Sequence, residues 1–439
     1  MRGAPNIGGK RMTLRVTDIE RFVINVPFRH RVRPWNELLV AKWGVIEIIK
    51  VTTSSRDIVG YGETLVHYTW QQVADETVGR VIGTNPAEHL ADDSLGAGLQ
   101  MALYDVVGQA LGVPMYRLLS ERKVRDWCPI SWWNTKMPAD LLAEEARDAL
   151  AEGYLAHKIK VRPWFDVREQ VQAISDVTPE SYLIDLDWNG MLRTPGEALP
   201  VLRELDAWSR VGLFESPIRQ DDVIGHAHLR GRLPRPLAEH FRKDLFPVWM
   251  RDDSLDAFVV FGAGVSGLMR QGQLAASFNK EFWLQVVGTG LTTAFTLHMG
   301  AVLSHATWPM VTGMNTLADD LIVEPIEIQH GLARTPERPG LGVTVDQEAI
   351  EKYRVDTSDV PETPLRILRF DLGDGRRRYY ADMLQLWRDC REDRNMPVQP
   401  RNASLSFHDD DGTQEFAETH RRLRSAPLWD MDLAPAAWT

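Results

Sequence analysis

Four short segments in the middle of the chain decide the fold: HKIK at 157–160, LDWNG at 186–190, LFESP at 213–217 and LAEH at 237–240. In each, an apolar run ends in a charged residue, and a turn and a segment with helical spacing follow. The acids Asp187, Glu215 and Glu239 are separated by 28 residues (215 − 187) and by 24 residues (239 − 215). This spacing is typical of successive strand–helix units of one parallel barrel.

Two lysines close the first of these segments. Alternate residues of a strand point to the same face, so Lys158 and Lys160 share a side, and Arg162 can follow them. Two ammonium groups held close together repel each other, which lowers the pKa of one of them from about 10.4. A lysine with a lowered pKa can act as a general base. The alternative is a strand edge that faces water, which fits poorly with a strand flanked by helices.

Three carboxylates at neighbouring strand ends repel one another unless a cation lies between them. Carboxylate oxygens without clustered cysteines favour magnesium, calcium or manganese over zinc. Each acid taken alone is better explained as a helix N-cap or a surface charge. As a series that follows Lys160, however, they predict a metal site, because the active face of a β/α barrel is built from the carboxyl ends of its strands.

Composition narrows the class of protein. The 439 residues include 44% hydrophobic side chains, which is typical of a globular protein, and the net charge of −11 argues against a nucleic-acid partner. No apolar run has the length of a membrane span, and the first residues lack the apolar segment of a signal peptide. The two cysteines, Cys128 and Cys390, lie far apart in sequence. We therefore expect a cytoplasmic protein without a disulfide framework or a membrane partner.

The chain divides into three predicted parts. Residues 1–126 hold strand-like runs followed by helical periodicity, which predicts an α+β domain. Over 127–345, short apolar runs alternate with amphipathic segments, and a weaker eighth run lies at 321–323. The predicted strands of this part end near Ser131, Lys160, Asp187, Glu215, Glu239, Phe261 and Gln285. Such a series predicts an α/β fold with a modified (β/α)7-8 barrel, and an open doubly wound sheet is the structural alternative.

Two regions outside the predicted barrel have less certain roles. The loop RHRVRPW at 29–35 is basic and aromatic in an acidic chain. Arginine offers forked donors that match carboxylates, so this loop is either a lid that meets an anionic ligand or a solvated connection. Residues 346–439 leave the repeat, and domain packing or subunit contact is the default interpretation for them.

In order and spacing, these motifs resemble the enolase superfamily, and within it the mandelate racemase and muconate lactonising enzyme branch. The resemblance covers residues 13–355 and extends to GYGE at 60–63, ALYD at 102–105 and PGLG at 339–342. It implies that 1–126 is a capping domain, that 127–345 is a TIM-type barrel with the metal site, and that 346–439 packs back on the capping domain and adds an extension. It also implies a small-molecule carboxylate substrate and a homo-oligomer.

The resemblance implies a role for each residue of the site. Lys160 is expected to abstract a proton, with Lys158 as its electrostatic partner, and Asp187, Glu215 and Glu239 to bind one Mg²⁺ per subunit. The expected substrate-binding residues are Arg31, His67, Arg162, Asn189, Gln285 and Asp320. The implied reaction removes the α-proton of a hydroxy or sugar carboxylate through an enediolate that the metal stabilises.

The pattern breaks on the sixth and seventh strands. Racemases of this branch carry an aspartate and a histidine there, and this chain has Phe261 and Gln285 at the aligned positions. Without a second base, the prediction moves to a dehydratase that eliminates water on one side, with Lys158, a water, His67 or Tyr68 as general acid. The alternatives are a racemase, epimerase or cycloisomerase of the same superfamily, and a non-catalytic binder of metal and sugar acid.

A glycine fingerprint offers an unrelated interpretation. GAGVSG at 262–267 has the form Gly-x-Gly-x-x-Gly after a predicted strand, which would predict an NAD-dependent oxidoreductase. Its place deep in the repeat argues against that function. His226 and His228 form a His-x-His without a matching partner nearby, so we expect them in a loop after the fourth strand rather than at a metal.

Overall fold

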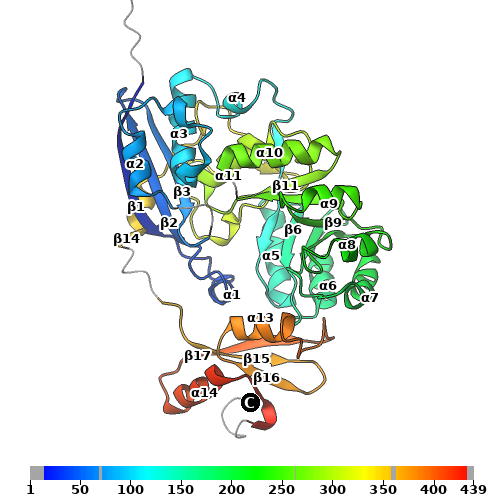
Figure 1. Ribbon diagram of the computed structural model, residues 1–439. Helices are drawn as coiled ribbons and strands as arrows, with labels where there is room; N and C mark the ends of the chain where they lie inside the picture. Colours follow the sequence, from blue (N-terminus) through cyan, green and yellow to red (C-terminus); the bar gives the residue numbers. More distant parts are fainter. Residues whose placement is uncertain (1–13, 69–71, 263, 357–361, 433–439) are drawn as a thin grey trace, which may run out of the picture.

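The computed structural model describes residues 14–68, 72–262, 264–356 and 362–432. Figure 1 shows an antiparallel sheet with helices beside it in blue, a curled parallel sheet wrapped by helices in cyan to yellow, and a small sheet with two helices in orange to red. No helix in the described ranges is long and apolar enough to cross a membrane. The predicted α/β fold, a modified barrel with an α+β capping domain, is confirmed.

The capping domain is built on an antiparallel sheet with the order β14-β1-β2-β3. Its strands are β1 (Val16–Asn25), β2 (Val45–Thr53), β3 (Val59–Leu65) and β14 (Arg354–Val355). Helix α3 (Ala97–Leu111) packs against β2 and β3. A Cβ on Gly60 or Gly62 would lie 2.4 Å from the Ala102 carbonyl oxygen or 2.0 Å from that of Gly98, so this close packing requires glycine at both positions. Shorter helices complete the domain: α1 (Arg33–Glu37), α2 (Asp75–Val81), α4 (Tyr116–Leu119) and 3-10 turns at Pro86–His89 and Asp93–Leu95.

The barrel is a seven-stranded parallel sheet in which the strands follow one another in chain order, from β5 to β11. The strands are β5 (Trp132–Asn134), β6 (Ala156–Lys160), β7 (Leu183–Asp187), β8 (Val211–Glu215), β9 (Leu237–His240), β10 (Ala257–Phe261) and β11 (Glu281–Gln285). The crossover helices are α5 (Ala139–Ala151), α6 (Val167–Val177), α7 (Pro195–Asp206), α8 (Val223–Arg230), α9 (Phe246–Arg251), α10 (Gly264–Ser277) and α11 (Gly290–Gly300). Four of these helices start at an N-cap whose side chain accepts a backbone hydrogen bond: Asp166, Thr194, Asp222 and Thr289.

The eighth position of the barrel lies elsewhere than predicted. Parallel bridges join Met310 to Ile130 and Val311 to Gln285, so residues 310–311 close the gap between the first and last strands. The predicted run at 321–323 instead forms a bridge between Ile322 and Val345. Two bridging residues are too short to leave a strand pattern in the sequence, whereas the apolar run at 321–323 resembles one.

Two carboxylates of the capping domain are bound to barrel helices. Glu63 is buried and accepts hydrogen bonds from the backbone N–H groups of Thr289 (2.7 Å) and Thr292 (3.0 Å), at the start of α11. Asp93 accepts hydrogen bonds from the N–H groups of Ser266 (2.9 Å) and Gly267 (2.8 Å), at the start of α10. Each carboxylate meets the positive end of a helix dipole.

Asp93 also gives the glycine fingerprint another role. A Cβ on Gly264 would lie 2.5 Å from the Asp93 carboxyl carbon, so glycine is needed here for the aspartate to reach the helix. The donors that would bind a dinucleotide phosphate are therefore bound by a carboxylate of the same chain.

The C-terminal part forms a separate small sheet with the order β17-β15-β16-β18. Its elements are β15 (Arg366–Asp371), β16 (Arg377–Tyr380), α13 (Met383–Arg391), β17 (Ser404–Asp409), α14 (Gln414–Ser425), β18 (Leu428–Trp429) and a 3-10 turn at Asp430–Asp432. Leu368 and Phe370 of β15 pack into the main core, and Ile367 packs into a separate outer cluster with Phe416. One face of this sheet thus continues the main hydrophobic core.

Contacts with the loops after β6 and β7 anchor this C-terminal part. Asn402 donates its backbone N–H to Asp166 (3.0 Å), and Arg193 donates to the Met396 carbonyl (3.1 Å). It also contacts α1, where Arg366 pairs with Glu37 (2.8 Å). The remaining elements are α12 (Gln347–Tyr353), a 3-10 turn at Met314–Thr316 and the sheet of β4 (Trp127–Pro129), β12 (Ile328–Gln329) and β13 (Leu332–Arg334).

Candidate active site

The five predicted catalytic and metal-binding side chains come from adjacent strand ends. Lys160 is the register partner of Asp187, and Asp187 is the partner of Glu215 on the next strand. Glu215 is in turn the partner of Ala238, so Glu239 follows at the end of β9. The carboxyl ends of parallel strands meet at one edge, and the sheet therefore brings these side chains together.

The two lysines differ in their surroundings. Lys158 pairs with Glu215, lies 3.7 Å from Asp187 and donates a hydrogen bond to Gln285 (2.7 Å), and its side chain is 1% exposed. Lys160 pairs with Asp187 alone and keeps 16% exposure. Burial acts to lower the pKa of both. Glu215 and Asp187 outweigh it at Lys158, whose pKa is raised, whereas burial prevails at Lys160, whose pKa is lowered from 10.5.

The three carboxylates are buried and are each held by cationic or donor side chains. Burial opposes ionisation of Asp187, but Lys160 and Lys158 hold its pKa well below the usual range. Glu239 accepts a hydrogen bond from the Ser216 hydroxyl (2.7 Å) and lies 3.0 Å from Nε2 of His226. His226 and His228 are both on helix α8, so the prediction of a loop is wrong for both residues. From this helix His226 reaches Glu239, one of the predicted metal ligands.

Whether the carboxylates suit a metal depends on chemistry and on arrangement. Both oxygens of Glu215 are buried: one pairs with Lys158, and the other lies 3.2 Å from Nε2 of His240. Oxygen-only donors of this kind fit magnesium. Among the described residues, however, no three His, Cys, Asp or Glu side chains converge in an arrangement that could hold a metal. Glu239 would have to turn away from His226 to join the other two.

Arg162 and Asn189 lie next to the charged strand ends. Arg162 donates hydrogen bonds to the Asn189 side chain (2.5 Å) and to the Asp187 carbonyl (3.0 Å), and burial lowers its pKa to about 10. The Asn189 backbone N–H in turn binds Asp187 (2.9 Å). Arg162 also lies over the ring of Trp387, 4.8 Å from its centroid, so α13 reaches this site. No periodicity in residues 360–439 had indicated that contact.

The ends of β10 and β11 carry no charge. Phe261 and Gln285 are register partners there, and Phe261 packs edge-on against His240 with centroids 4.5 Å apart. Tyr68, in the turn after β3 of the capping domain, shares a hydrogen bond with the Gln285 side chain. Desolvation of its hydroxyl raises the pKa of Tyr68 above the ordinary value of 10, although the residue as a whole is 48% exposed, so the phenol is protonated at neutral pH.

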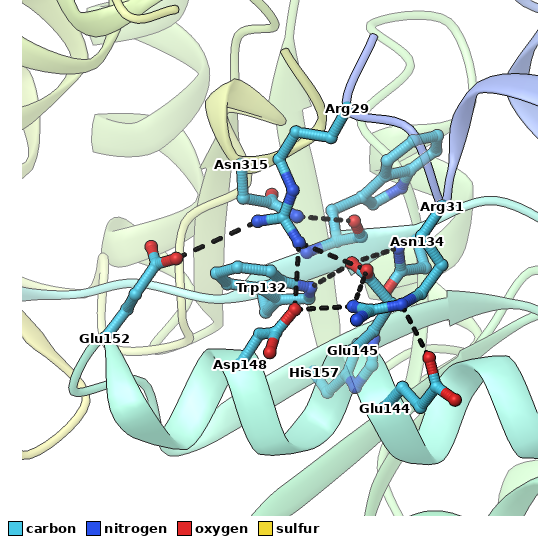
Figure 2. Close-up of polar contacts among 11 residues, drawn as sticks. Arg29, Arg31, Trp132, Asn134, Glu144, Glu145, Asp148, Glu152, His157 and Asn315 are labelled. Atoms are coloured by element: carbon cyan, nitrogen blue, oxygen red, sulfur yellow. Dashed lines mark hydrogen bonds and ion pairs between the residues drawn. The ribbon is translucent and has the colours of Figure 1, made fainter. Parts of the chain in front are cut away.

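Arg31 lies away from this site. Figure 2 shows Arg29 and Arg31 above helix α5, with carboxylates of that helix directed toward them. Arg31 pairs with Glu144 (2.8 Å) and Glu145 (2.7 Å), and Glu145 is fully buried beneath it. In this structure the anionic partner of the basic loop is helix α5 of the same chain, and substrate binding by Arg31 stays a prediction.

His67 and Asp320 are also placed apart from the charges. His67 is exposed, and burial together with nearby Lys42 lowers its pKa. Asp320 accepts the Gly290 N–H at its carbonyl (2.9 Å), and its carboxylate faces the Ile322 N–H (3.4 Å). In the described part of the chain, no hydrogen bond or ion pair joins either residue to the strand-end lysines and acids.

One buried cation was missed in the sequence. Lys136 follows β5, is fully buried and donates a hydrogen bond to the Thr135 hydroxyl (3.3 Å). Burial, and then Arg162 and Lys160, lower its pKa well below 10.5. An isolated lysine in a predicted loop carries no pattern that would have singled it out.

Comparison with known proteins identifies the family. The family described as "Enolase C-terminal domain-like" matches residues 141–349, the range that contains the charged strand ends. Residues 141–349 are therefore similar to the barrel domain of the enolase superfamily. The predicted resemblance to this superfamily and to its mandelate racemase and muconate lactonising enzyme branch is confirmed.

Curated relatives of this chain include sugar-acid dehydratases. Arabinonate dehydratase of Saccharolobus solfataricus is 28% identical over 305 residues, which cover 66% of this chain and 79% of the relative. D-gluconate dehydratase of Thermoproteus tenax is 24% identical over 377 residues, which cover 75% of this chain and 74% of the relative. An o-succinylbenzoate synthase and an N-succinylamino acid racemase are also similar. The prediction of an enzyme of lyase or isomerase type is confirmed at the level of the superfamily.

Solved structures share the fold. The N-succinyl Arg/Lys racemase of Bacillus cereus matches with a TM-score of 0.64 at 21% identity, over 78% of this chain and 98% of that one. A putative L-alanine-DL-glutamate epimerase of Burkholderia xenovorans, solved with magnesium and fumarate, matches with a TM-score of 0.63 at 21% identity, over 78% and 97%.

Proposed function

We propose that this protein is a magnesium-dependent dehydratase that removes the α-proton of a hydroxy or sugar carboxylate and eliminates water from the same side. One observation carries the proposal. The charged strand ends lie on β6 to β9, and the ends of β10 and β11 carry Phe261 and Gln285. Two-base racemisation needs a base on each face of the substrate, whereas syn elimination needs one. The two dehydratases among the relatives support the same reaction class.

The metal would be held by Asp187, Glu215 and Glu239. These are buried oxygen donors on adjacent strand ends, the ligand type that magnesium prefers. Magnesium, when bound, supplies positive charge against the substrate carboxylate and against the charge that develops there as the proton leaves. That one neighbouring structure holds magnesium with a small carboxylate supports this assignment.

Each remaining side chain has a role that follows from its surroundings. Lys160, the more exposed lysine, takes the α-proton as the free amine. Lys158, fixed between Glu215 and Gln285, remains a positive charge that stabilises the developing anion. Tyr68 donates its phenolic proton to the leaving hydroxide, which departs as water, and solvent restores that proton. Arg162 positions Asn189 at the edge of the site.

Deuterium exchange tests the assignment. In deuterated buffer with Mg²⁺, a panel of aldonic and aldaric acids is followed by NMR at the α-carbon, and 2-keto acid formation is measured in parallel. Lys160→Ala should lose exchange by about 10²- to 10⁴-fold. Lys243→Ala, at an exposed lysine, is the matched control and should behave as wild type. Exchange by Lys160→Ala at the wild-type rate would show that the base is another residue.

A second candidate is a binder of metal and sugar acid without turnover. The observation in its favour is that Phe261 and Gln285 replace the ionisable pair expected on the far strands. A protein that binds these acids tightly and never exchanges their α-protons would support this candidate over the dehydratase. The homo-oligomeric state and the three domain boundaries stay predictions.

A further inference from the structure

A pocket of about 750 Å³ lies between the barrel and the C-terminal part. Barrel residues on one side come from the loops after β7, β8 and β9, and residues from α13 and the turn after it form the other side. The lining residues that matter for its chemistry are Asn189, Arg193, Arg242, Trp387, Arg391 and Arg394. The volume is within the range of sites for small molecules and far exceeds that of a single small ion.

The pocket is continuous with the candidate active site. Asn189, Ser216 and His240 line it, and each follows a predicted metal ligand closely in sequence. Asn189 donates to the Asp187 carboxylate (2.9 Å) and accepts from Arg162 (2.5 Å). A substrate whose carboxylate lies at the strand ends can therefore extend its chain into this pocket.

The pocket carries excess positive charge on its C-terminal side. Arg219 is neutralised by a two-point ion pair with Asp221, and Arg242 pairs with Asp244. In contrast, no hydrogen bond or ion pair of Arg391 or Arg394 occurs within the described ranges, and Glu392 is the remaining acid on the wall.

Arg391 is fixed in position rather than loose. A Cβ on Gly190 would lie 3.1 Å from its Nη2 and 3.2 Å from its Nε, so the guanidinium rests on the backbone of the turn that follows β7. The end of α13 is held by Arg193, which donates to the carbonyls of Cys390 (3.4 Å) and Met396 (3.1 Å). The side chain of Arg193 is 8% exposed, and its Nε is buried without an acceptor. A buried donor without an acceptor, such as Nε of Arg193, is costly unless a ligand satisfies it, whereas Arg391 is half-buried and faces the pocket.

We propose that this pocket binds the distal anionic group of the substrate, a second carboxylate or a phosphate, and that Arg391 and Trp387 of α13 determine this specificity. The proposal rests on the proposed function, because it places the reacting carboxylate at the strand ends. Arginine presents a planar fork that binds either anion at two points, and an indole beside it offers an apolar face to the substrate chain. The C-terminal part would then be a specificity element of the active site.

Calorimetry on the full-length protein tests this inference apart from turnover. Gluco-, galacto- and manno-configured acids are titrated with Mg²⁺ as matched sets: the aldonate, the aldarate with a second carboxylate, and the 6-phosphoaldonate. At least one aldarate or phosphate should bind roughly tenfold or more tightly than its aldonate, and Arg391→Ala should abolish that difference. Which of the two gains affinity distinguishes carboxylate from phosphate.

Arg388→Ala is the matched control. Arg388 lies on the same helix, is 70% exposed and pairs with Asp393 outside the pocket, so its variant should keep the preference. Equal affinity within every set, no measurable binding of any aldarate or phosphate, or an equal loss in Arg388→Ala would overturn the proposal. A preference that depends on Arg391 in a protein that never exchanges α-protons would uphold the pocket and reject the dehydratase.

Discussion

The two sides of the barrel mouth differ in chemistry although they share one sheet. Strands β6 to β9 end in two lysines and three carboxylates, all buried or nearly so. Strands β10 and β11 end in Phe261 and Gln285, an aromatic ring that is 37% exposed and a neutral amide. The amide accepts the hydrogen bond of Lys158, so the uncharged side serves to hold the charged one in place. Under the proposed function, this asymmetry would confine proton transfer to one face of a bound substrate.

The largest effect is expected from a substitution on the charged side of the mouth. Lys158→Met removes the cation between Glu215 and Asp187 and leaves two buried carboxylates with less compensation. We expect a loss of about 3–5 kcal/mol in the free energy of unfolding, measured by urea denaturation in a chelator. Added Mg²⁺ should recover part of that loss if the same carboxylates bind it. An unchanged stability in the chelator would contradict the assigned charge balance.

Strand β6, which carries Lys158, also carries the buried neutral side chain of His157 on its other face. Burial lowers the pKa of His157 to about 3, so on acidification the unfolded chain, with a histidine pKa of about 6.5, takes up the proton first. Its contribution to the free energy of unfolding is complete above pH 6.5 and is lost as the pH falls toward 3. The loss amounts to about 3 kcal/mol at pH 4.

In denaturant titrations between pH 4 and pH 8, His157→Gln should lose less unfolding free energy on acidification than wild type does. His228→Gln, at an exposed histidine, should show the same pH dependence of the unfolding free energy as wild type. Parallel pH profiles for His157→Gln and wild type would show that His157 takes no part in acid unfolding.

The proposed role of Tyr68 as the proton donor beside Gln285 is tested by removing its hydroxyl. Tyr68→Phe removes the phenolic proton beside Gln285 while it keeps the ring that packs on Trp43, 4.5 Å away. Water elimination should slow by about 10²-fold, and α-deuterium exchange should persist because Lys160 is intact. Tyr353→Phe is the comparison variant. Equal losses of exchange and elimination would assign Tyr68 to substrate binding rather than to protonation.

The smallest expected effect comes from adding charge to the neutral side. The double variant Phe261→Asp with Gln285→His places an acid next to a histidine, because the two positions are register partners. Slow deuteration with inversion at the α-carbon should appear, followed by NMR and chiral chromatography. Deuteration with retention alone would mean that the histidine does not reach the second face.

The strand ends of the barrel mouth were predictable from the sequence, whereas the contacts that other segments make with them were not. Each of Asp187, Glu215 and Glu239 ends a local apolar run, so a short-range pattern placed all three on strand ends. The partners of Arg31 lie on α5 more than 100 residues away, and nothing local distinguishes that ion pair from a substrate contact. Trp387 and Arg391 reach the mouth through tertiary packing of a segment for which the sequence predicted only domain packing or subunit contact. His226 was misplaced because its short helix lacks strong periodicity.

The carboxylates of Glu63 and Asp93 have a consequence for how the molecule opens. Each is the acceptor for the first N–H groups of a barrel helix, so separating the capping domain from the barrel would leave two helix ends and two acids without partners. Swinging of the whole capping domain, as in a hinged lid, is therefore costly. The capping domain and the barrel should therefore melt in one cooperative transition.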